Sequence, residues 1–177
     1  MRRNILLLAI ITAVSAPVVA SESNAFRLGV GYSETDIEVL SNSDDYGTGF
    51  KVELGYDVNP YVGIKLSYEQ NEGDIGSTNV SYEGSTVKGG FDLGYPVESP
   101  IGVFKPYVTL GFSGYSEESN LLGGSRFSSS QFYYGIGARY TSSVNVYLDL
   151  SYDLFEVEDA VLSYDMTQLA FTVGYQF

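Results

Sequence analysis

The residues of this sequence that could do chemistry are carboxylates and cations, because the chain contains neither His nor Cys. Without His it lacks the usual general base and the commonest metal ligand, and without Cys it lacks thiolate nucleophiles and disulfides. Ten charged residues recur at alternate positions within apolar segments: Arg27, Lys51, Glu53, Lys65, Glu69, Lys88, Asp92, Arg139, Asp149 and Asp153. Two of these carboxylates could form an acid–base pair, but the five matched cations favour a structural ion network.

Other short motifs do not indicate catalysis. Gly111-Phe112-Ser113-Gly114 lacks the spacing of a nucleophile elbow, and no helical pattern follows Gly29-Val30-Gly31, as a dinucleotide site would require. Two acidic clusters are candidate Ca²⁺ or Mg²⁺ ligands, although neither has the spacing of a calcium loop: Asp44 with Asp45, and Glu156 with Glu158 and Asp159. We therefore expect no catalytic residue, no cofactor and no resident metal.

The charge balance limits the partners. Nine Lys and Arg stand against 22 Asp and Glu, for a net charge of −13. Nucleic acid is excluded as a partner, because a phosphate backbone needs a basic surface.

The N-terminus has the layout of a secretory signal peptide. Arg2 and Arg3 precede a ten-residue apolar run at 5–14, and Val18-Val19-Ala20 provides a cleavage site. The run is short for a helical span, so a retained membrane anchor is the less favoured alternative. We expect residues 1–20 to be removed and 21–177 to form one domain, which is exported across an inner membrane.

The rest of the chain alternates with period two, which predicts strands with two different faces. Eight such segments occur, at 26–32, 50–56, 62–68, 87–95, 106–112, 132–140, 144–152 and 167–177. Short connections at 57–60, 96–103 and 141–143 are rich in turn formers, whereas those at 33–46, 70–84, 116–130 and 155–165 are long and polar. This arrangement predicts an all-β, eight-stranded, antiparallel up-and-down barrel.

The two faces of the predicted strands indicate which medium surrounds the barrel. The apolar face carries no charge, whereas the opposite face carries the ten charged residues and many glycines. Paired charges among small residues suit the narrow lumen of an eight-stranded barrel, so the apolar face should meet lipid. Tyr and Phe at strand ends fit aromatic girdles at the membrane interfaces, namely Tyr32, Tyr56, Tyr61, Tyr68, Tyr95, Phe104, Tyr140, Tyr152 and Tyr175. The alternative is a soluble ligand-binding barrel, with its apolar face inside.

The C-terminal strand carries the most specific resemblance. Leu169, Phe171, Val173, Tyr175 and the terminal Phe177 alternate with small or polar residues, and 105–111 (KPYVTLG) resembles a fifth barrel strand. The chain resembles the small eight-stranded outer-membrane barrels of Gram-negative bacteria, of the OmpA transmembrane-domain and OmpX/Ail-like type. The resemblance implies that the barrel-assembly machinery reads those five C-terminal residues, and that outer-membrane lipid and lipopolysaccharide surround the protein.

We expect a non-enzymatic outer-membrane protein, most simply a monomer, with a plugged or narrow polar lumen. The long connections hold 14 acidic residues and only Arg126 as a base, which predicts acidic extracellular loops. Such a protein would contribute to envelope integrity or contact a surface ligand through its loops. A small porin for ions or polar solutes is the competing function, and the lumenal charges should discriminate between the two.

Overall fold

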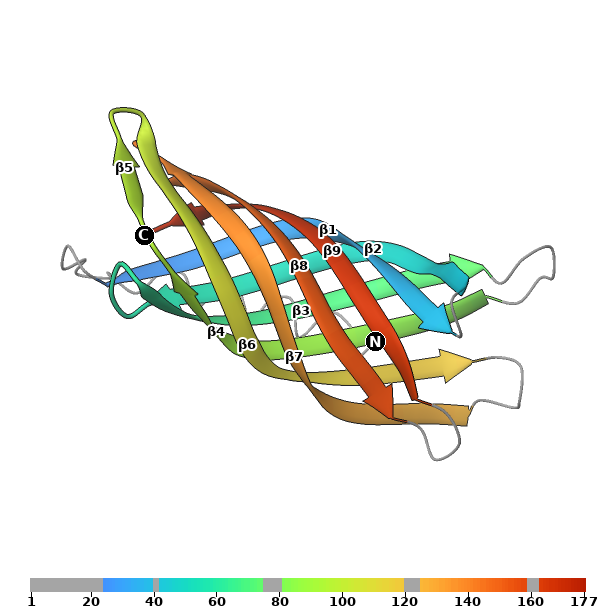
Figure 1. The fold of residues 1–177 in the computed structure, drawn as a ribbon. Helices are drawn as coiled ribbons and strands as arrows, with labels where there is room; N and C mark the ends of the chain where they lie inside the picture. The colour runs from blue at the N-terminus through green and yellow to red at the C-terminus, as the bar shows by residue number, and fades with distance from the viewer. Residues whose placement is uncertain (1–23, 40–41, 75–80, 120–124, 159–162) are drawn as a thin grey trace.

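The computed structural model of the protein describes residues 24–39, 42–74, 81–119, 125–158 and 163–177. Within them the chain forms only strands and turns (Figure 1), and no helix there is long and apolar enough to cross a membrane. The strands are β1 (Ala25–Val39), β2 (Asn42–Asp57), β3 (Val62–Asp74), β4 (Ser81–Gly94), β5 (Val97–Ser99), β6 (Gly102–Ser119), β7 (Ser125–Ser142), β8 (Val146–Glu158) and β9 (Ser163–Gln176).

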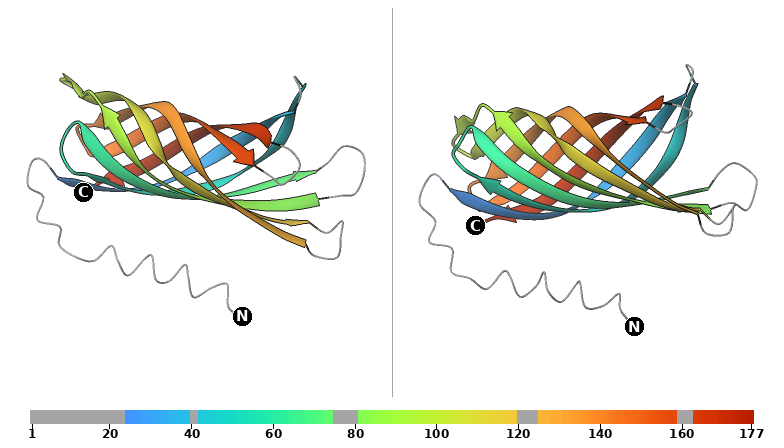
Figure 2. Two further views of the ribbon diagram at one scale, coloured as in Figure 1. Left: turned by 60° about the horizontal axis from the view of Figure 1, so that its bottom comes forward. Right: turned by 90° about the horizontal axis from the view of Figure 1, so that it is seen from below.

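Eight of these strands close into an antiparallel barrel, as the sequence predicts. Neighbours along the chain pair with one another, β1 pairs with β9, and β4 pairs with β6, while the short β5 pairs only with the start of β6. The shear of the barrel follows from the register of its strand pairs. If each residue is followed to its partner on the next strand, starting at Phe26 in β1, the path around the barrel comes back to β1 at Asp36, which is a shear of ten residues (36 − 26). A shear larger than the strand number tilts the strands strongly, by about 40°, and Figure 2 shows the crossing.

The two ends of the barrel differ. Tight turns join β2 to β3, β5 to β6 and β7 to β8, and the C-terminus lies at the same end, which we call the turn end (Figure 1). Asn59 shapes the first turn, because its Oδ1 accepts hydrogen bonds from the amides of Tyr61 and Val62, both at 2.9 Å. Asn145 shapes the last with φ = 64°, a conformation that Asn tolerates better than most residues. The opposite end, where β1, β3, β6 and β8 end, is the loop end.

The predicted extent of the four long connections is wrong. The strands run well into all four segments: β1 continues to Val39, β2 begins at Asn42, and β6 extends to Ser119. Beyond the apolar band the outer face of a strand no longer meets lipid, so hydrophobic alternation stops while the hydrogen-bonded ladder continues. β5, inside the predicted connection 96–103, was also not expected.

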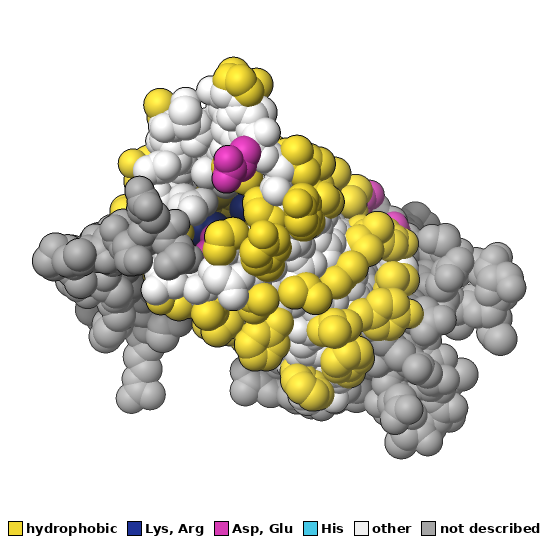
Figure 3. Space-filling model, turned by 60° about the vertical axis from the view of Figure 1, so that its left-hand side comes forward, with side chains coloured by type: hydrophobic (Ala, Val, Ile, Leu, Met, Phe, Trp, Pro, Cys, Tyr) yellow, Lys and Arg dark blue, Asp and Glu magenta, His cyan; other side chains and the backbone are white. Residues whose placement is uncertain are grey.

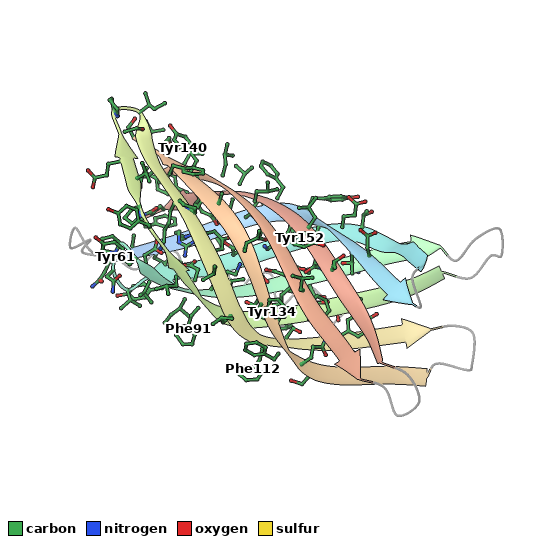
Figure 4. All side chains as sticks on the ribbon, in the orientation of Figure 1. Tyr61, Phe91, Phe112, Tyr134, Tyr140 and Tyr152 are labelled. Carbon is green, nitrogen blue, oxygen red and sulfur yellow. The ribbon has the colours of Figure 1, made fainter. Side chains whose placement is uncertain are left out.

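The apolar side chains point outward. Val30, Leu66, Phe91, Ile136 and Leu150 are each at least 50% exposed although they lie in the middle of strands. In Figure 4, Tyr61, Phe91, Phe112, Tyr134, Tyr140 and Tyr152 point away from the barrel wall. A soluble barrel would bury this face, so that alternative is excluded.

Candidate functional site

The structure places all ten predicted charged residues inside the barrel, where none is more than 3% exposed. Their inward direction follows from strand geometry, because successive side chains alternate between the two faces and the other face meets lipid. Two layers of charge result, one near the turn end and one in the middle of the lumen.

The turn-end layer consists of Arg27, Asp57, Asp92, Lys105, Arg139 and Asp149. Asp92 is its centre: Arg139 Nη2 lies 3.0 Å from its Oδ2, Arg27 Nη2 lies 3.3 Å from the same oxygen, and Lys105 Nζ lies 3.3 Å from its Oδ1. Arg27 Nε also lies 3.0 Å from Asp57 Oδ2. Three cations thus contact the one buried carboxylate of Asp92, and the same three cations also contact Asp57.

Asp149 completes that layer. It accepts hydrogen bonds from Arg139 Nε at 2.9 Å and from the Tyr107 hydroxyl at 2.7 Å. With this contact the turn-end layer contains three cations and three anions, so its net charge is zero. Such neutrality is what makes burial of six charges tolerable in a narrow lumen.

The middle layer consists of Lys51, Glu53, Lys65, Glu69, Lys88 and Asp153. Lys88 Nζ lies 2.6 Å from Asp153 Oδ2 and 3.5 Å from Glu69 Oε1, and Lys51 Nζ lies 3.1 Å from Glu53 Oε2. Lys65 Nζ makes no hydrogen bond to the described residues and lies 5.3 Å from the centre of the Tyr107 ring. This layer also balances three cations with three anions.

Sequence reasoning missed Asp57 and Lys105. From the sequence, Asp57 falls in a turn and Lys105 only within the segment 105–111, yet Lys105 is 7% exposed and both residues join the turn-end layer. Strand parity could have found them, because Asp57 continues the inward series of Lys51 and Glu53, and Lys105 alternates with the lipid-facing Pro106.

Glycines make room for the large lumenal side chains. A Cβ at Gly137 would overlap the ring of Tyr107, and a Cβ at Gly55 would lie 2.7 Å from the guanidinium carbon of Arg27. The Arg139 guanidinium in turn lies 5.2 Å from the Tyr107 ring centre. Rings and charges therefore fill the space that the glycines leave.

Beyond the middle layer, larger side chains point into the lumen toward the loop end. Tyr115, Phe155 and Met166 point inward and are at most 3% exposed, and Phe155 is the register partner of Met166. We call these three residues the cap. Because β6, β8 and β9 supply them beyond the lipid-facing band, they give the strand extensions a small core.

At the turn end, by contrast, the lumen is hollow. A cavity of about 660 Å³ opens there, with Asp57, Lys105 and Arg139 in its wall together with Gln176 and Phe177. Figure 3 looks toward this end and shows Lys and Arg side chains inside the hollow, with apolar side chains along one side of it. The charged interior is thus approached from the turn end.

The five predicted C-terminal signal residues lie on the outer face of β9 and at its end. Leu169, Phe171, Val173, Tyr175 and Phe177 are between 37% and 47% exposed. The Phe177 amide donates to the Phe26 carbonyl at 2.7 Å, and the Phe177 ring lies 5.0 Å from that of Tyr175. The terminal residue is therefore fixed to β1, where the barrel closes.

The acidic clusters remain untested as metal ligands. The side chains of Asp44, Asp45, Glu156 and Glu158, and Asp159 as a whole, lie outside the described part of the chain. Among the side chains that the structure describes, no group of three or more carboxylates could hold a metal ion.

An antiparallel eight-stranded barrel, apolar outside and charged inside, defines an integral β-barrel membrane protein. The chain matches the model of the outer membrane protein beta-barrel domain over residues 6–177. It belongs to this family, and it is a protein of the outer membrane of Gram-negative bacteria. No curated protein sequence matches it.

Several solved structures share the fold. Neisserial surface protein A (NspA) has a TM-score of 0.65 and 18% identity, covering 86% of this chain and 99% of that one. Ail, the attachment invasion locus protein of Yersinia pestis, has a TM-score of 0.60 and 16% identity, covering 88% and 99%. The N-terminal barrel domain of Pseudomonas aeruginosa OprF has a TM-score of 0.56 and 17% identity, covering 88% and 98%. At such identities the likeness concerns the fold.

Proposed function

We propose that the protein is a non-enzymatic outer-membrane scaffold whose lumen is plugged, and that it contributes to envelope integrity or to contacts at the cell surface. The observation that carries this proposal is the pair of neutral charge layers beneath the cap. A solute moving through would have to separate buried ion pairs and displace Phe155 and Met166, and separating such pairs is costly.

The same contacts argue against catalysis. A general base needs a carboxylate free to take a proton, whereas Asp92, Asp149 and Asp153 are each held by a cation at 3.0 Å or less. Glu53 likewise has Lys51 at 3.1 Å. We expect the purified protein not to hydrolyse lipid A, phospholipid or peptides, and turnover of any of these would contradict the proposal.

A small pore is the second candidate, and the turn-end cavity is the observation that favours it. That cavity leads to Lys105 and Arg139, so water and ions can approach the inner charges from one side. In the pore hypothesis, the middle layer and the cap would open transiently.

Planar-bilayer conductance of the refolded mature chain separates the two functions. We expect no current steps from the inserted wild-type barrel, nor from Lys88→Ala, because the turn-end layer still closes the lumen. Val87→Ala is the matched control, since Val87 is the lipid-facing neighbour of Lys88 and is 47% exposed. Steps in the wild type that change in Lys88→Ala but not in Val87→Ala would establish the pore and overturn the scaffold.

The partners follow from this role. We propose that lipid and lipopolysaccharide surround a monomeric barrel, that the assembly machinery reads the C-terminal residues, and that residues 1–20 are removed as a signal peptide. We propose further that the acidic connections face outward, where they could bind divalent cations between lipopolysaccharide phosphates.

A surface ligand of this protein should differ in charge from one known for a relative. Ail has been solved in complex with the heparin analogue sucrose octasulfate. The connections of this chain carry 14 acids and a single base, Arg126, which would repel a polysulfate. We expect no retention on heparin resin at physiological salt, with Ail as the positive control, and salt-sensitive retention would refute this expectation.

A further inference from the structure

The hairpin formed by β5 and the start of β6 lies at the turn end of the barrel, where the start of β6 also pairs with β7 through Gly102↔Ser142 and Phe104↔Tyr140. β5 pairs with β6 through Val97↔Phe104 and Ser99↔Gly102, and on its other side it has no strand partner among the described residues. Figures 1 and 2 show that the hairpin projects beyond the barrel and leans away from its axis. We call residues 97–104 the arm.

Hydrogen bonds hold the arm in this position. The Ile101 carbonyl at its tip accepts from the Tyr140 hydroxyl at 2.8 Å and from the Ser143 amide at 3.2 Å. The Ser99 hydroxyl donates to the Gly102 carbonyl at 2.7 Å, and Gly102 has φ = 154°, which favours glycine. The tip is thus tied to β7 and to the β7–β8 turn, so its direction is set by the fold.

The surface that the arm presents is apolar. Ile101 is 69% exposed, and Val144 in the neighbouring turn is 68% exposed; these are among the most exposed large apolar side chains of the described chain. Val97 and Phe104 are also exposed, and Glu98 is the arm's single charged residue. Figure 3 shows apolar side chains at the end of the projecting hairpin. Such a patch would be costly to leave in water.

The patch continues the surface that already meets lipid. Phe104 lies at the turn-end edge of the apolar band, on the same strand as the lipid-facing Val108 and Leu110. Ile101 follows three residues further out, about 10 Å along an extended chain. The polar region on each side of a bilayer is about 5–8 Å thick. Straight along the barrel axis this length would carry Ile101 past the headgroups, but the arm leans away from the axis, so Ile101 stays at the headgroup region beside the apolar band.

We propose that the arm and Val144 form a membrane-anchoring surface that lies in the leaflet at the turn end of the barrel, with Ile101 at the headgroup boundary. Its ligand is zwitterionic phospholipid. The arm contains no Lys or Arg with which to attract an anionic surface, and it carries Glu98, which an anionic surface would repel. The arm binds lipid by burying apolar side chains, so its insertion into the leaflet should not depend on salt concentration.

The absence of Trp from the chain makes this proposal directly measurable. Single-Trp variants of the mature chain are refolded into phosphatidylethanolamine-containing vesicles whose acyl chains carry bromine near the headgroup or near the chain end. Ile101→Trp tests the arm tip. Pro60→Trp, on the β2–β3 turn at the wall of the turn-end cavity, is the matched control exposed to water. Leu148→Trp, on the lipid-facing wall, confirms that the barrel has inserted.

We expect Ile101→Trp to be quenched roughly twofold or more above Pro60→Trp, most strongly by bromine near the headgroup, because interfacial side chains lie about 5–10 Å into the boundary. Its emission should be blue-shifted and unchanged when protein is diluted into lipid. Equal quenching at Ile101 and Pro60 would overturn the proposal. A blue shift that disappears on dilution would mean that a second copy covers the arm, and stronger quenching in anionic lipid would contradict the proposed lipid class.

Discussion

Inside the barrel, individual charges depend on their partners rather than on water. Lys88 shows this most clearly, with Asp153 at 2.6 Å, Glu69 at 3.5 Å and aromatic rings of Tyr133 and Phe155 centred 5.5 and 5.9 Å away. Removing one partner of a buried pair leaves the other charged in a medium of low polarity, which typically costs about 3–5 kcal/mol. Removing both partners and leaving apolar side chains costs much less.

A double-mutant cycle at this pair tests whether the layers hold the barrel together. Lys88→Met and Asp153→Leu should each lower the free energy of unfolding by about 3 kcal/mol, whereas the double variant should lose clearly less than their sum. Urea unfolding in vesicles, followed by far-UV circular dichroism and electrophoretic mobility, gives the values. Val87→Met, on the lipid-facing side of the same strand, controls for placing a methionine in β4. Additive single effects would mean that Lys88 and Asp153 are not energetically coupled.

Strand parity predicted which residues face inward, but the choice of partners could not be read from it. Asp92 meets Arg139 and Arg27, which lie 47 and 65 residues away in the chain. Those contacts depend on the shear of the barrel, because a different stagger would place other side chains at the same height. Strand parity thus predicts whether each side chain faces the lumen or the lipid, whereas the closure of the whole sheet determines which charged side chains form ion pairs.

At the scale of elements, hydrophobic alternation located the strands but not their ends. It stops at Tyr32 in β1, yet the ladder with β2 and β9 runs on past Asp36. A strand shows alternating apolar residues in its sequence only where one of its faces meets lipid or a packed core. Phe155 was the missed signal, because it is apolar at an inward position where the pattern requires a polar residue, and its partner Met166 lies directly opposite.

The C-terminal strand carries a prediction about assembly rather than stability. Phe177 is 37% exposed, and its ring lies 6.4 Å from that of Phe26 at the seam where β1 and β9 close the barrel. If the machinery reads this terminus, Phe177→Ser should strongly reduce the folded protein in outer membranes of expressing cells, with little effect on refolding in vitro. Phe132→Ser, which removes a lipid-facing aromatic residue from β7, is the matched control. Equal loss for both variants would make Phe177 an ordinary lipid contact.

For the molecule as a whole, the main asymmetry lies along the barrel axis. The cap of Tyr115, Phe155 and Met166 lies inside the barrel toward the loop end, and an open cavity lies at the turn end. Short turns of outer-membrane barrels face the periplasm, so the cavity should open inward and the cap should face the cell exterior. The barrel would then be sealed toward the outside and wet toward the inside.

Thiol accessibility measures this asymmetry without interference, since the chain has no native Cys. Thr141→Cys, in the wall of the cavity, should react with a small polar thiol reagent at the rate of an exposed thiol. Ser113→Cys, at a position that is 1% exposed and lies opposite Lys88, should react roughly tenfold more slowly, which corresponds to an opening free energy of about 1.4 kcal/mol.

Adding Phe155→Ala should speed the reaction at position 113, because it removes the largest apolar ring of the cap, whereas Leu154→Ala on the outer face should not. Equal rates at positions 141 and 113 with the cap intact would mean that the reagent already reaches the middle layer, past the turn-end layer or past the cap, and the scaffold function would give way to the pore.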